Sequence, residues 1–238
     1  MRFCHRLRPI SLVLGFLLSV AAAGLYLGYR QGWVPAPLSV QDEDRQKYQR
    51  PADVLKALEI SPGDWVADVG AGNGYYARRM ADLVGPNGKV FGEDIADDAI
   101  ETMRKRFKTL GLRNLEIVKG ADDDPKLPVD SLSSVLIVNA YHHFEHPQAM
   151  LNQIFRSLKP GGRLVIGDYS NPDHRNQSRE NQLDIHEIAS ELVQAELTQA
   201  GFQVVKCENS FMRRMPEAKR GYRIKASDMW LMVAVRAK

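Results

Sequence analysis

Strand-like segments alternate with helix-like segments along most of the chain after Pro51. The strand-like segments are short and apolar, whereas the segments between them repeat apolar residues at helical spacing. Strands that are separated by helices pair in parallel, and the helices cover both faces of the resulting sheet. The expected strands span residues 65–69, 89–94, 115–118, 134–138, 163–167, 202–207 and 229–235, and the expected helices span residues 51–60, 75–84, 97–110, 147–158 and 184–200.

The last two expected strands, residues 202–207 and 229–235, have no helix between them. A connection without a helix joins neighbouring strands in antiparallel fashion. We therefore predict an α/β fold whose seven-stranded sheet is doubly wound and mostly parallel, with an antiparallel strand at the end of the chain. Long polar loops are expected over residues 170–183 and 209–227.

Residues 10–29 form an uncharged run of 20 residues, and four arginines but no acids lie within residues 1–30. A helix of that length is about 30 Å long, which matches the hydrocarbon core of a membrane. We predict that residues 1–30 form an uncleaved single-pass anchor, so that the protein is located at a membrane. The alternative is a signal peptide cleaved after the small residues 21–23, which leaves a periplasmic or secreted protein.

The rest of the chain is predicted to be a linker over residues 31–47 and one folded domain over residues 48–238. Its net charge is close to zero, because the overall charge of +3 comes from residues 1–30. No concentrated basic face is therefore expected, and nucleic acid is not a predicted partner. The only two cysteines, Cys4 and Cys207, exclude a disulfide framework and a thiolate zinc site.

A glycine-rich loop, residues 70–74, follows the first expected strand. Its third glycine, Gly74, comes one residue earlier than the dinucleotide-binding pattern requires. Asp68 precedes the loop and is expected to repel a pyrophosphate but to attract an ammonium or sulfonium group. Asp94 ends the second expected strand, where a carboxylate is able to bind both ribose hydroxyls. This combination favours a positively charged nucleoside over a nicotinamide dinucleotide.

With these residues the chain resembles the class I S-adenosylmethionine-dependent methyltransferases. Residues 66–74 are similar to the first motif of that family, residues 90–95 to its second-strand motif, and residues 158–164 to the segment that leads into its fifth strand. Residues 141–144 and 147–151 further resemble a bacterial subgroup of methyltransferases with export-like N-terminal segments. The resemblance spans residues 48–238. It implies a Rossmann-like fold and, with the anchor, a location at the bacterial inner membrane.

The resemblance also implies which residues bind S-adenosylmethionine. The glycines would contact the methionine portion, Asp94 the ribose, and an acid after the third strand the adenine. Strict register places Ala121 at that last position, so Asp122 and Asp123 are both candidates. The alternative is that both are solvent-exposed acids of a turn with no role in binding. The implied cofactor-binding residues are Asp68, Gly70, Gly72, Gly74, Asp94, Ile95, Asp122, Asp123 and Asn139.

Residues 139–144, at the tip of the fourth expected strand, are the expected position of the residues that face the methyl acceptor. His142 and His143 are the candidate catalytic bases, because imidazole titrates near neutral pH. The two prolines of the amino-methyltransferase pattern are replaced by Ala140 and His142, which argues against methylation of DNA bases. No metal site is predicted. The candidate ligand set for a metal consists of His142 and His146 with either Asp168 or His186. Pro147 disfavours a helix at His146 and so weakens this set.

The predicted function is S-adenosylmethionine-dependent methyl transfer to a small-molecule or lipid-like acceptor. The alternatives are a non-catalytic module that binds an adenosyl ligand and, third, a NAD-type oxidoreductase. The N-terminal arginines predict that the domain is exported, whereas S-adenosylmethionine is made in the cytosol. The side of the membrane on which the domain lies is therefore left open.

Overall fold

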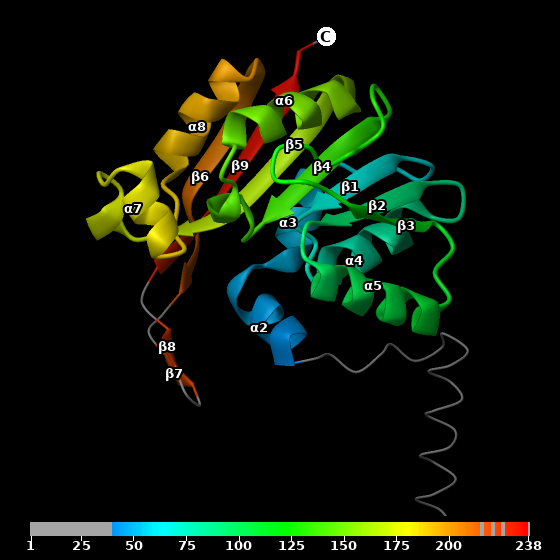
Figure 1. The fold of residues 1–238 in the computed structure, drawn as a ribbon, viewed down its shortest axis with the longest axis horizontal. Coiled ribbons are helices and arrows are strands. Elements are labelled where there is room, and N and C mark those ends of the chain that lie inside the picture. The colour runs from blue at the N-terminus through cyan, green and yellow to red at the C-terminus, as the bar shows by residue number, and fades with distance from the viewer. Residues whose placement is uncertain (1–39, 215–216, 220–221, 225–226, 238) are drawn as a thin grey trace, which may run out of the picture. The chain divides into compact units, whose positions relative to one another are not determined.

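The computed structural model describes residues 40–214, 217–219, 222–224 and 227–237. Their centre is a seven-stranded sheet with the order β3-β2-β1-β4-β5-β9-β6, and β7 and β8 form a separate two-stranded sheet (Figure 1). The strands are β1 (Trp65–Val69), β2 (Lys89–Asp94), β3 (Leu115–Lys119), β4 (Leu132–Val138), β5 (Leu158–Ser170), β6 (Phe202–Arg214), β7 (Glu217–Lys219), β8 (Tyr222–Ile224) and β9 (Ser227–Arg236). The helices are α2 (Val40–Tyr48), α3 (Pro51–Ala57), α4 (Tyr75–Val84), α5 (Asp97–Leu110), α6 (Pro147–Ser157), α7 (Arg179–Asp184) and α8 (Ser190–Gln199), with the short 3-10 helices η1 (Tyr141–His143) and η2 (Pro172–His174).

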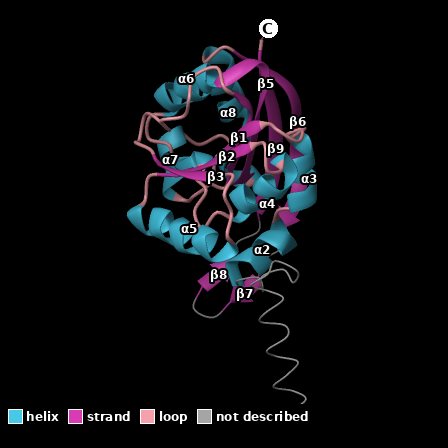
Figure 2. Ribbon diagram, turned by 90° about the vertical axis from the view of Figure 1, so that its right-hand side faces the viewer, coloured by secondary structure: helices cyan, strands magenta, loops and turns pink. Residues whose placement is uncertain are grey.

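Helices cover both faces of the sheet, as Figure 2 shows. Side chains that alternate along each strand enter two separate apolar cores. On one face, α6 and α8 pack over the strands through residues such as Ile154 and Leu197. On the other face, α3, α4 and α5 do so through residues such as Val54, Met80 and Met103. This double covering explains why the central strands are apolar on both sides, and it confirms the predicted doubly wound sheet.

The first five strands are parallel, and β9 is antiparallel to both of its neighbours, β5 and β6. The predicted antiparallel strand at the end of the chain is therefore confirmed. It lies inside the sheet rather than at its edge, and its residues from Met229 to Ala234 are almost fully buried. The indole N–H of Trp230 donates to the carbonyl oxygen of Ile188 at 2.8 Å, which ties β9 to the segment before α8.

The predicted helix over residues 184–200 is wrong, because the chain breaks it into α7 and α8. His186 lies in the break with a left-handed φ of 56°. The predicted polar loops are also shorter than expected. The loop over residues 170–183 contains η2 and most of α7, and the loop over residues 209–227 contains the end of β6 together with β7 and β8.

Residues 40–47, predicted to be part of the linker, belong instead to α2. This helix has few apolar side chains, and ionic contacts hold it on the domain. Asp42, only 1% exposed, pairs with Arg106 of α5 at 2.7 Å. Arg45 donates to the side chain of Asn73 in the glycine loop at 2.7 Å. The helix therefore covers the glycine loop.

The predicted anchor, residues 1–30, and the linker up to residue 39 lie outside the described residues. Among the helices that the structure describes, none combines the length and the apolar character needed to cross a bilayer.

Candidate active site

The glycine loop leads from the end of β1 into α4 and lies against the end of β4. Gly70 has a φ of 69°, and a Cβ atom at this position would lie 2.5 Å from Cβ of Ala140. Glycine is therefore required for the two strand ends to approach each other. The strand order reverses between β1 and β4, which is the position where open α/β sheets bind their ligands.

The other two glycines of the loop have different surroundings. Gly72 donates its N–H to Oδ2 of Asp94 at 2.8 Å. Gly74 caps the N-terminus of α4, and a Cβ atom there would overlap the ring of Phe107. Gly74 thus has a packing role that connects α4 to α5. Its contact with the methionine portion of a cofactor stays a prediction, as does that of Gly72.

Asp68 lies at the end of β1 with its side chain buried. Its Oδ2 accepts the N–H of Ala77 at 2.9 Å, which fixes the first turn of α4 against the strand. Burial raises the pKa of Asp68 to about 7, although that hydrogen bond and the guanidinium of Arg45 act in the opposite direction. A cation that binds near this carboxyl group would favour its ionised form.

Two acids end β2, and the structure gives them different roles. Asp94 accepts two backbone N–H groups, from Gly72 at 2.8 Å and from Ala96 at 2.9 Å. Glu93 was not among the residues predicted from the sequence. It is 1% exposed, accepts the N–H of Gly70 at 3.3 Å, and its Oε1 accepts no hydrogen bond from any described residue. Burial raises the pKa of Glu93 to about 8. The signal available in the sequence was an acid inside an apolar strand.

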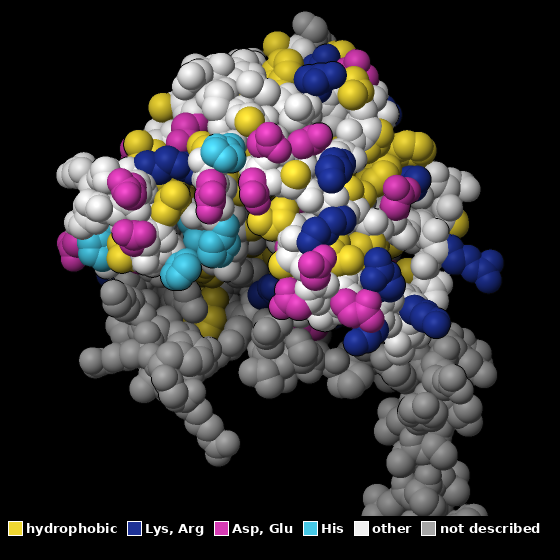
Figure 3. Space-filling model, viewed as in Figure 1, with side chains coloured by type: hydrophobic (Ala, Val, Ile, Leu, Met, Phe, Trp, Pro, Cys, Tyr) yellow, Lys and Arg dark blue, Asp and Glu magenta, His cyan; other side chains and the backbone are white. Residues whose placement is uncertain are grey.

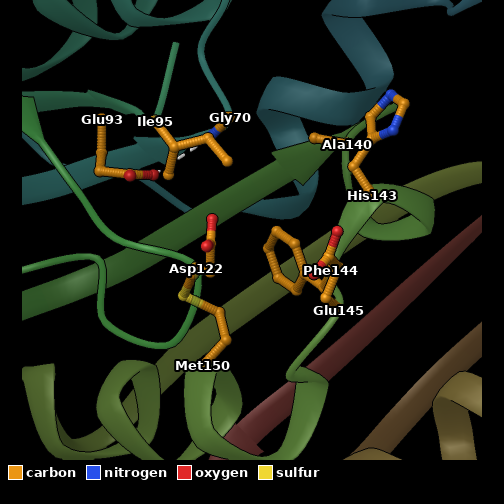
Figure 4. Close-up of a pocket in the computed structure, with 9 residues that line it drawn as sticks. All are labelled: Gly70, Glu93, Ile95, Asp122, Ala140, His143, Phe144, Glu145 and Met150. Carbon is orange, nitrogen blue, oxygen red and sulfur yellow. Dashed lines mark hydrogen bonds between the residues drawn. The ribbon is translucent and has the colours of Figure 1, made fainter.

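A cavity opens beside these acids, with about 560 Å³ of empty space that includes its open mouth. Nine residues line it: Gly70, Glu93, Ile95, Asp122, Ala140, His143, Phe144, Glu145 and Met150 (Figure 4). The side chain of Ile95 is 46% exposed. The unpaired Oε1 of Glu93 next to an exposed apolar side chain fits a nucleoside, because a carboxyl oxygen accepts hydrogen bonds from ribose hydroxyl groups and the apolar side chain packs against the base.

Three of the residues predicted to bind the cofactor line the cavity: Gly70, Ile95 and Asp122. Of the two candidate acids after β3, Asp122 faces the cavity and Asp123 is not among its lining residues. Asn139 is exposed at the end of β4 with a left-handed φ of 54°, and its backbone N–H donates to Gly167. The predicted contacts of Asp94, Asp123 and Asn139 with a cofactor stay predictions.

The two predicted catalytic histidines lie in η1, directly after β4. Nδ1 of His142 is 2.9 Å from Oδ1 of Asp168, a buried residue near the end of β5. His142 is itself buried, whereas His143 is exposed and reaches the cavity. Partial burial of the ring, together with the imidazoles of His142 and His186, lowers the pKa of His143. Neutral imidazoles of this kind accept protons.

The structure also decides which histidines lie near each other. His186 joins His142 and His143, so that one nitrogen of each ring lies within 4.8 Å of the others. The considered pairing of His142 with His146 is not part of this cluster. Arg179 of α7 donates to the carbonyl oxygen of Phe144 at 2.9 Å, which helps to hold α7, and the segment that follows it, beside η1.

The fold and the cavity define a class I S-adenosylmethionine-dependent methyltransferase domain. Residues 60–223 match the family described as a methyltransferase domain, and the chain belongs to that family. A solved structure of an S-adenosylmethionine-dependent methyltransferase from Aquifex aeolicus superimposes with a TM-score of 0.64, at 23% identity, over 81% of this chain and 93% of that one. At that identity the likeness shows the fold alone.

Two curated relatives match shorter parts of the chain. The chain is 33% identical over 124 residues to a protein-L-isoaspartate O-methyltransferase of Ignicoccus hospitalis. This match covers 52% of this chain and 56% of the relative. It is 32% identical over 114 residues to a ubiquinone/menaquinone biosynthesis C-methyltransferase of Ectopseudomonas mendocina. This match covers 48% of this chain and 44% of the relative. The chain therefore spans about half the length of these relatives.

Proposed function

We propose that this protein transfers the methyl group of S-adenosylmethionine to an ionisable hydroxyl group of a small-molecule or lipid-like acceptor. The observation that carries the proposal is the position of the histidines. His143 lines the cavity that fits the nucleoside, and its neighbour His142 is oriented by the buried carboxylate of Asp168. A positioned base is thus adjacent to the expected site of the cofactor.

The chain's own residues supply binding and proton transfer. Glu93, Ile95 and Asp122 would hold the nucleoside, while Asp68 favours the positive charge near the glycine loop. The bound cofactor supplies a methyl group on a sulfonium, and the carbon–sulfur bond breaks as the bond to the acceptor oxygen forms, leaving S-adenosylhomocysteine. Asp168 accepts the Nδ1–H of His142, so that Nε2 carries a free lone pair and takes the hydroxyl proton.

The names of the two curated relatives refer to methylation at oxygen and at carbon. A phenol that loses its proton becomes nucleophilic at both its oxygen and its ring carbons, so one base serves either product. A neutral amine already has a free lone pair on its nitrogen, so it needs no such base. This reasoning supports a phenol-like acceptor. A lipid-like one would also suit the predicted N-terminal anchor, and the membrane location itself remains part of the proposal.

Cofactor binding is tested by thermal unfolding of the full-length protein in a mild detergent. At 100 times its dissociation constant a ligand stabilises by about 2.7 kcal/mol, which raises the midpoint by roughly 5–10 °C for a domain of this size. We expect this shift with S-adenosylmethionine and S-adenosylhomocysteine but not with NAD. Asp94→Ala is expected to reduce the shift. A shift with NAD alone would favour the oxidoreductase alternative.

Methyl transfer is tested with a labelled methyl donor and a panel of phenolic and lipid-like acceptors. A general base contributes about 10²–10⁴-fold to such a reaction, so His142→Ala should lower the rate by about 10²-fold or more while the thermal shift with the cofactor is retained. His146→Ala, at an exposed position outside the cluster, is the matched control. Transfer by His142→Ala at the parent rate would refute the role of the histidines.

A further inference from the structure

Three imidazole rings from two separate segments meet beside the cavity, and one of them, that of His143, lines it. The ring centres of His142 and His143 are 4.0 Å apart, and the ring of His186 lies 5.7 Å from the first and 5.4 Å from the second. One nitrogen of each lies within 4.8 Å of the others. Figure 3 shows histidine side chains gathered on this face of the molecule, with acidic side chains around them.

A buried carboxylate fixes the orientation of one of these rings. Asp168 is fully buried, and it lies 2.9 and 3.1 Å from Nδ1 of His142 through its two oxygens. It also accepts the backbone N–H groups of His142 and Tyr169. The carboxylate therefore accepts a hydrogen bond from Nδ1–H and leaves Nε2 of His142 with a free lone pair for a metal ion. Histidines that bind metals are held by a carboxylate in this way.

The third ring is presented by a strained backbone. His186 has a φ of 56°, a conformation that residues other than glycine adopt rarely and that is found often at functional sites. Backbone hydrogen bonds hold it there, because His186 donates its N–H to Leu183 at 2.9 Å and Glu187 donates to Gln182 at 3.0 Å. The break between α7 and α8 thus places one histidine against η1.

We propose that His142, His143 and His186 bind one divalent transition-metal ion, with Asp168 orienting the first ligand. Imidazole nitrogen is a ligand for zinc and its neighbours in the first transition row, whereas magnesium and calcium require oxygen. Three histidines with a fourth position open are the ligand set of catalytic zinc sites. Zinc–nitrogen bonds of about 2.0–2.1 Å require the three nitrogens to move closer together, and the exposed side chains of His143 and His186 allow that movement. This departs from the expectation of no metal.

The open position of such a metal would face the methyl acceptor, because His143 belongs both to the cluster and to the cavity. A bound cation lowers the pKa of a coordinated hydroxyl group. The acceptor would then lose its proton to water rather than to Nε2 of His142, and the methyl group would be transferred to the metal-bound oxygen. Metal binding stands on the geometry of the cluster alone, whereas this role of the metal rests on the proposed methyl transfer to a hydroxyl group, in which the metal would replace His142 as the group that promotes loss of the proton.

The test is a metal titration of the full-length protein, purified in detergent without a polyhistidine tag and stripped with a chelator. We expect one equivalent of Co²⁺ to produce the visible absorption of a low-coordinate nitrogen site, and Zn²⁺ to displace it. Asp168→Asn should weaken binding by about 10–100-fold, the usual effect of removing a partner of a ligand. His186→Ala should weaken it at least as much, and His146→Ala should leave it unchanged.

The thermal shift with S-adenosylmethionine, measured on each variant, reports that the domain is folded. Metal binding that is absent, or that is equal in His186→Ala and the parent, would overturn the site if the cofactor shift is intact. Metal binding without methyl transfer to any acceptor would contradict only the proposed function. Methyl transfer that is unaffected by the chelator would overturn the role of the metal and leave His142 as the base.

Discussion

At the scale of single residues, the charge of Asp68 is controlled by burial. The carboxyl group is 3% exposed and has a pKa of about 7, because water does not reach its charged form. In the unfolded chain the same group ionises near its ordinary value of 3.8. The folded protein therefore holds this proton more tightly than the unfolded chain does. Between these two pKa values, folding stability should fall as the pH rises.

We predict that Asp68→Asn removes much of this pH dependence. Each pKa unit corresponds to about 1.4 kcal/mol, so the free energy of unfolding of the parent should fall by a few kcal/mol between about pH 4 and pH 7 through this group. The amide oxygen of asparagine still accepts the N–H of Ala77. The variant should therefore match the parent near pH 4 and exceed its stability at pH 8, as measured by urea denaturation without ligand.

The exposed residue Asp98 provides the control, because Asp98→Asn removes a carboxylate that is in water. The free energy of unfolding of this variant should change with pH as that of the parent does. Equal slopes for Asp68→Asn and the parent would show that the buried carboxyl group is already ionised in the folded protein.

Sequence patterns indicated candidate residues better than they indicated which of them meet. Asp68 and Gly70 were predicted from positions next to a strand end, which depend only on local chain order, whereas the register after the third strand left Asp122 and Asp123 both open. Glu93 was overlooked, because the acid after it matched the motif and hid the one that faces the cavity. The pairing of His142 with Asp168 joins two strand ends that are neighbours only after the sheet has formed.

At the scale of elements, α2 shows how ionic contacts replace apolar packing. Its residues repeat no apolar pattern, so the sequence favoured a linker. The buried carboxylate of Asp42 is held by Arg106, and Arg45 reaches the glycine loop. Such contacts with another part of the chain leave no periodic signal. An isolated helix of nine residues is marginal in water, so its helical state depends on these partners.

We predict that Arg106→Ala releases α2 from the domain. Removal of Arg106 weakens the ionic contacts of the buried carboxylate of Asp42, which keeps Arg45 at 3.6 Å and the side chain of Asn73 at 3.4 Å. The cost should therefore lie below about 3–5 kcal/mol, the cost of a buried charge that loses its only partner. Local detachment of α2 avoids much of this cost, so the thermal midpoint should change less than that energy implies. Trypsin cleavage after Arg45 and Lys47, followed by mass spectrometry, should become at least about tenfold faster, since 1.4 kcal/mol corresponds to a factor of ten.

Arg104 is the matched control, because it lies on the same helix and pairs with Glu101 at the surface. Trypsin should cleave the Arg104→Ala variant after Arg45 and Lys47 at the same rate as the parent protein. Equal cleavage of the two variants would mean that the ion pair of Asp42 does not hold α2.

The break between α7 and α8 marks the limit of periodicity as a predictor. Apolar residues continue at helical spacing through this region, and the sequence contains no proline or glycine between 184 and 200 that would end a helix. The side chain of Gln182 accepts the N–H of Ala189 at 2.6 Å, and Trp230 donates to Ile188. Contacts from β9 and from within the turn therefore override the local preference.

At the scale of the whole molecule, the sheet was predictable because strand order follows from connections. Strands separated by helices are parallel, and the helix-free connection between β6 and β9 made the last strand antiparallel. The insertion of β9 between β5 and β6 was not derivable from local patterns. In the structure β9 is buried on both faces, as central strands are, whereas β6 carries polar residues of the kind found on edge strands.

At the same scale, the predicted anchor raises the question of the side of a membrane on which the domain would lie. The positive-inside rule counts lysines and arginines within about 15–20 residues of each end of a span. Three lie on each side of residues 10–29: Arg2, Arg6 and Arg8 before them, and Arg30, Arg45 and Lys47 after them. The flanks are balanced by this wider count, which removes the preference for export that the N-terminal arginines alone predict. The supply of S-adenosylmethionine in the cytosol then favours a domain on the cytosolic side.

The two cysteines offer a direct test, because Cys4 and Cys207 flank the predicted span. Cys207 is a free, exposed thiol. In intact cells, a membrane-impermeant maleimide should label Cys4 and leave Cys207 unlabelled until the cells are permeabilised. Cys207→Ser and Cys4→Ser, each with one thiol left, assign the signal. Labelling of Cys207 in intact cells would place the domain outside, where methyl transfer would depend on a supply of donor beyond the cytosol. Loss of Cys4 from the mature chain would indicate a cleaved signal peptide.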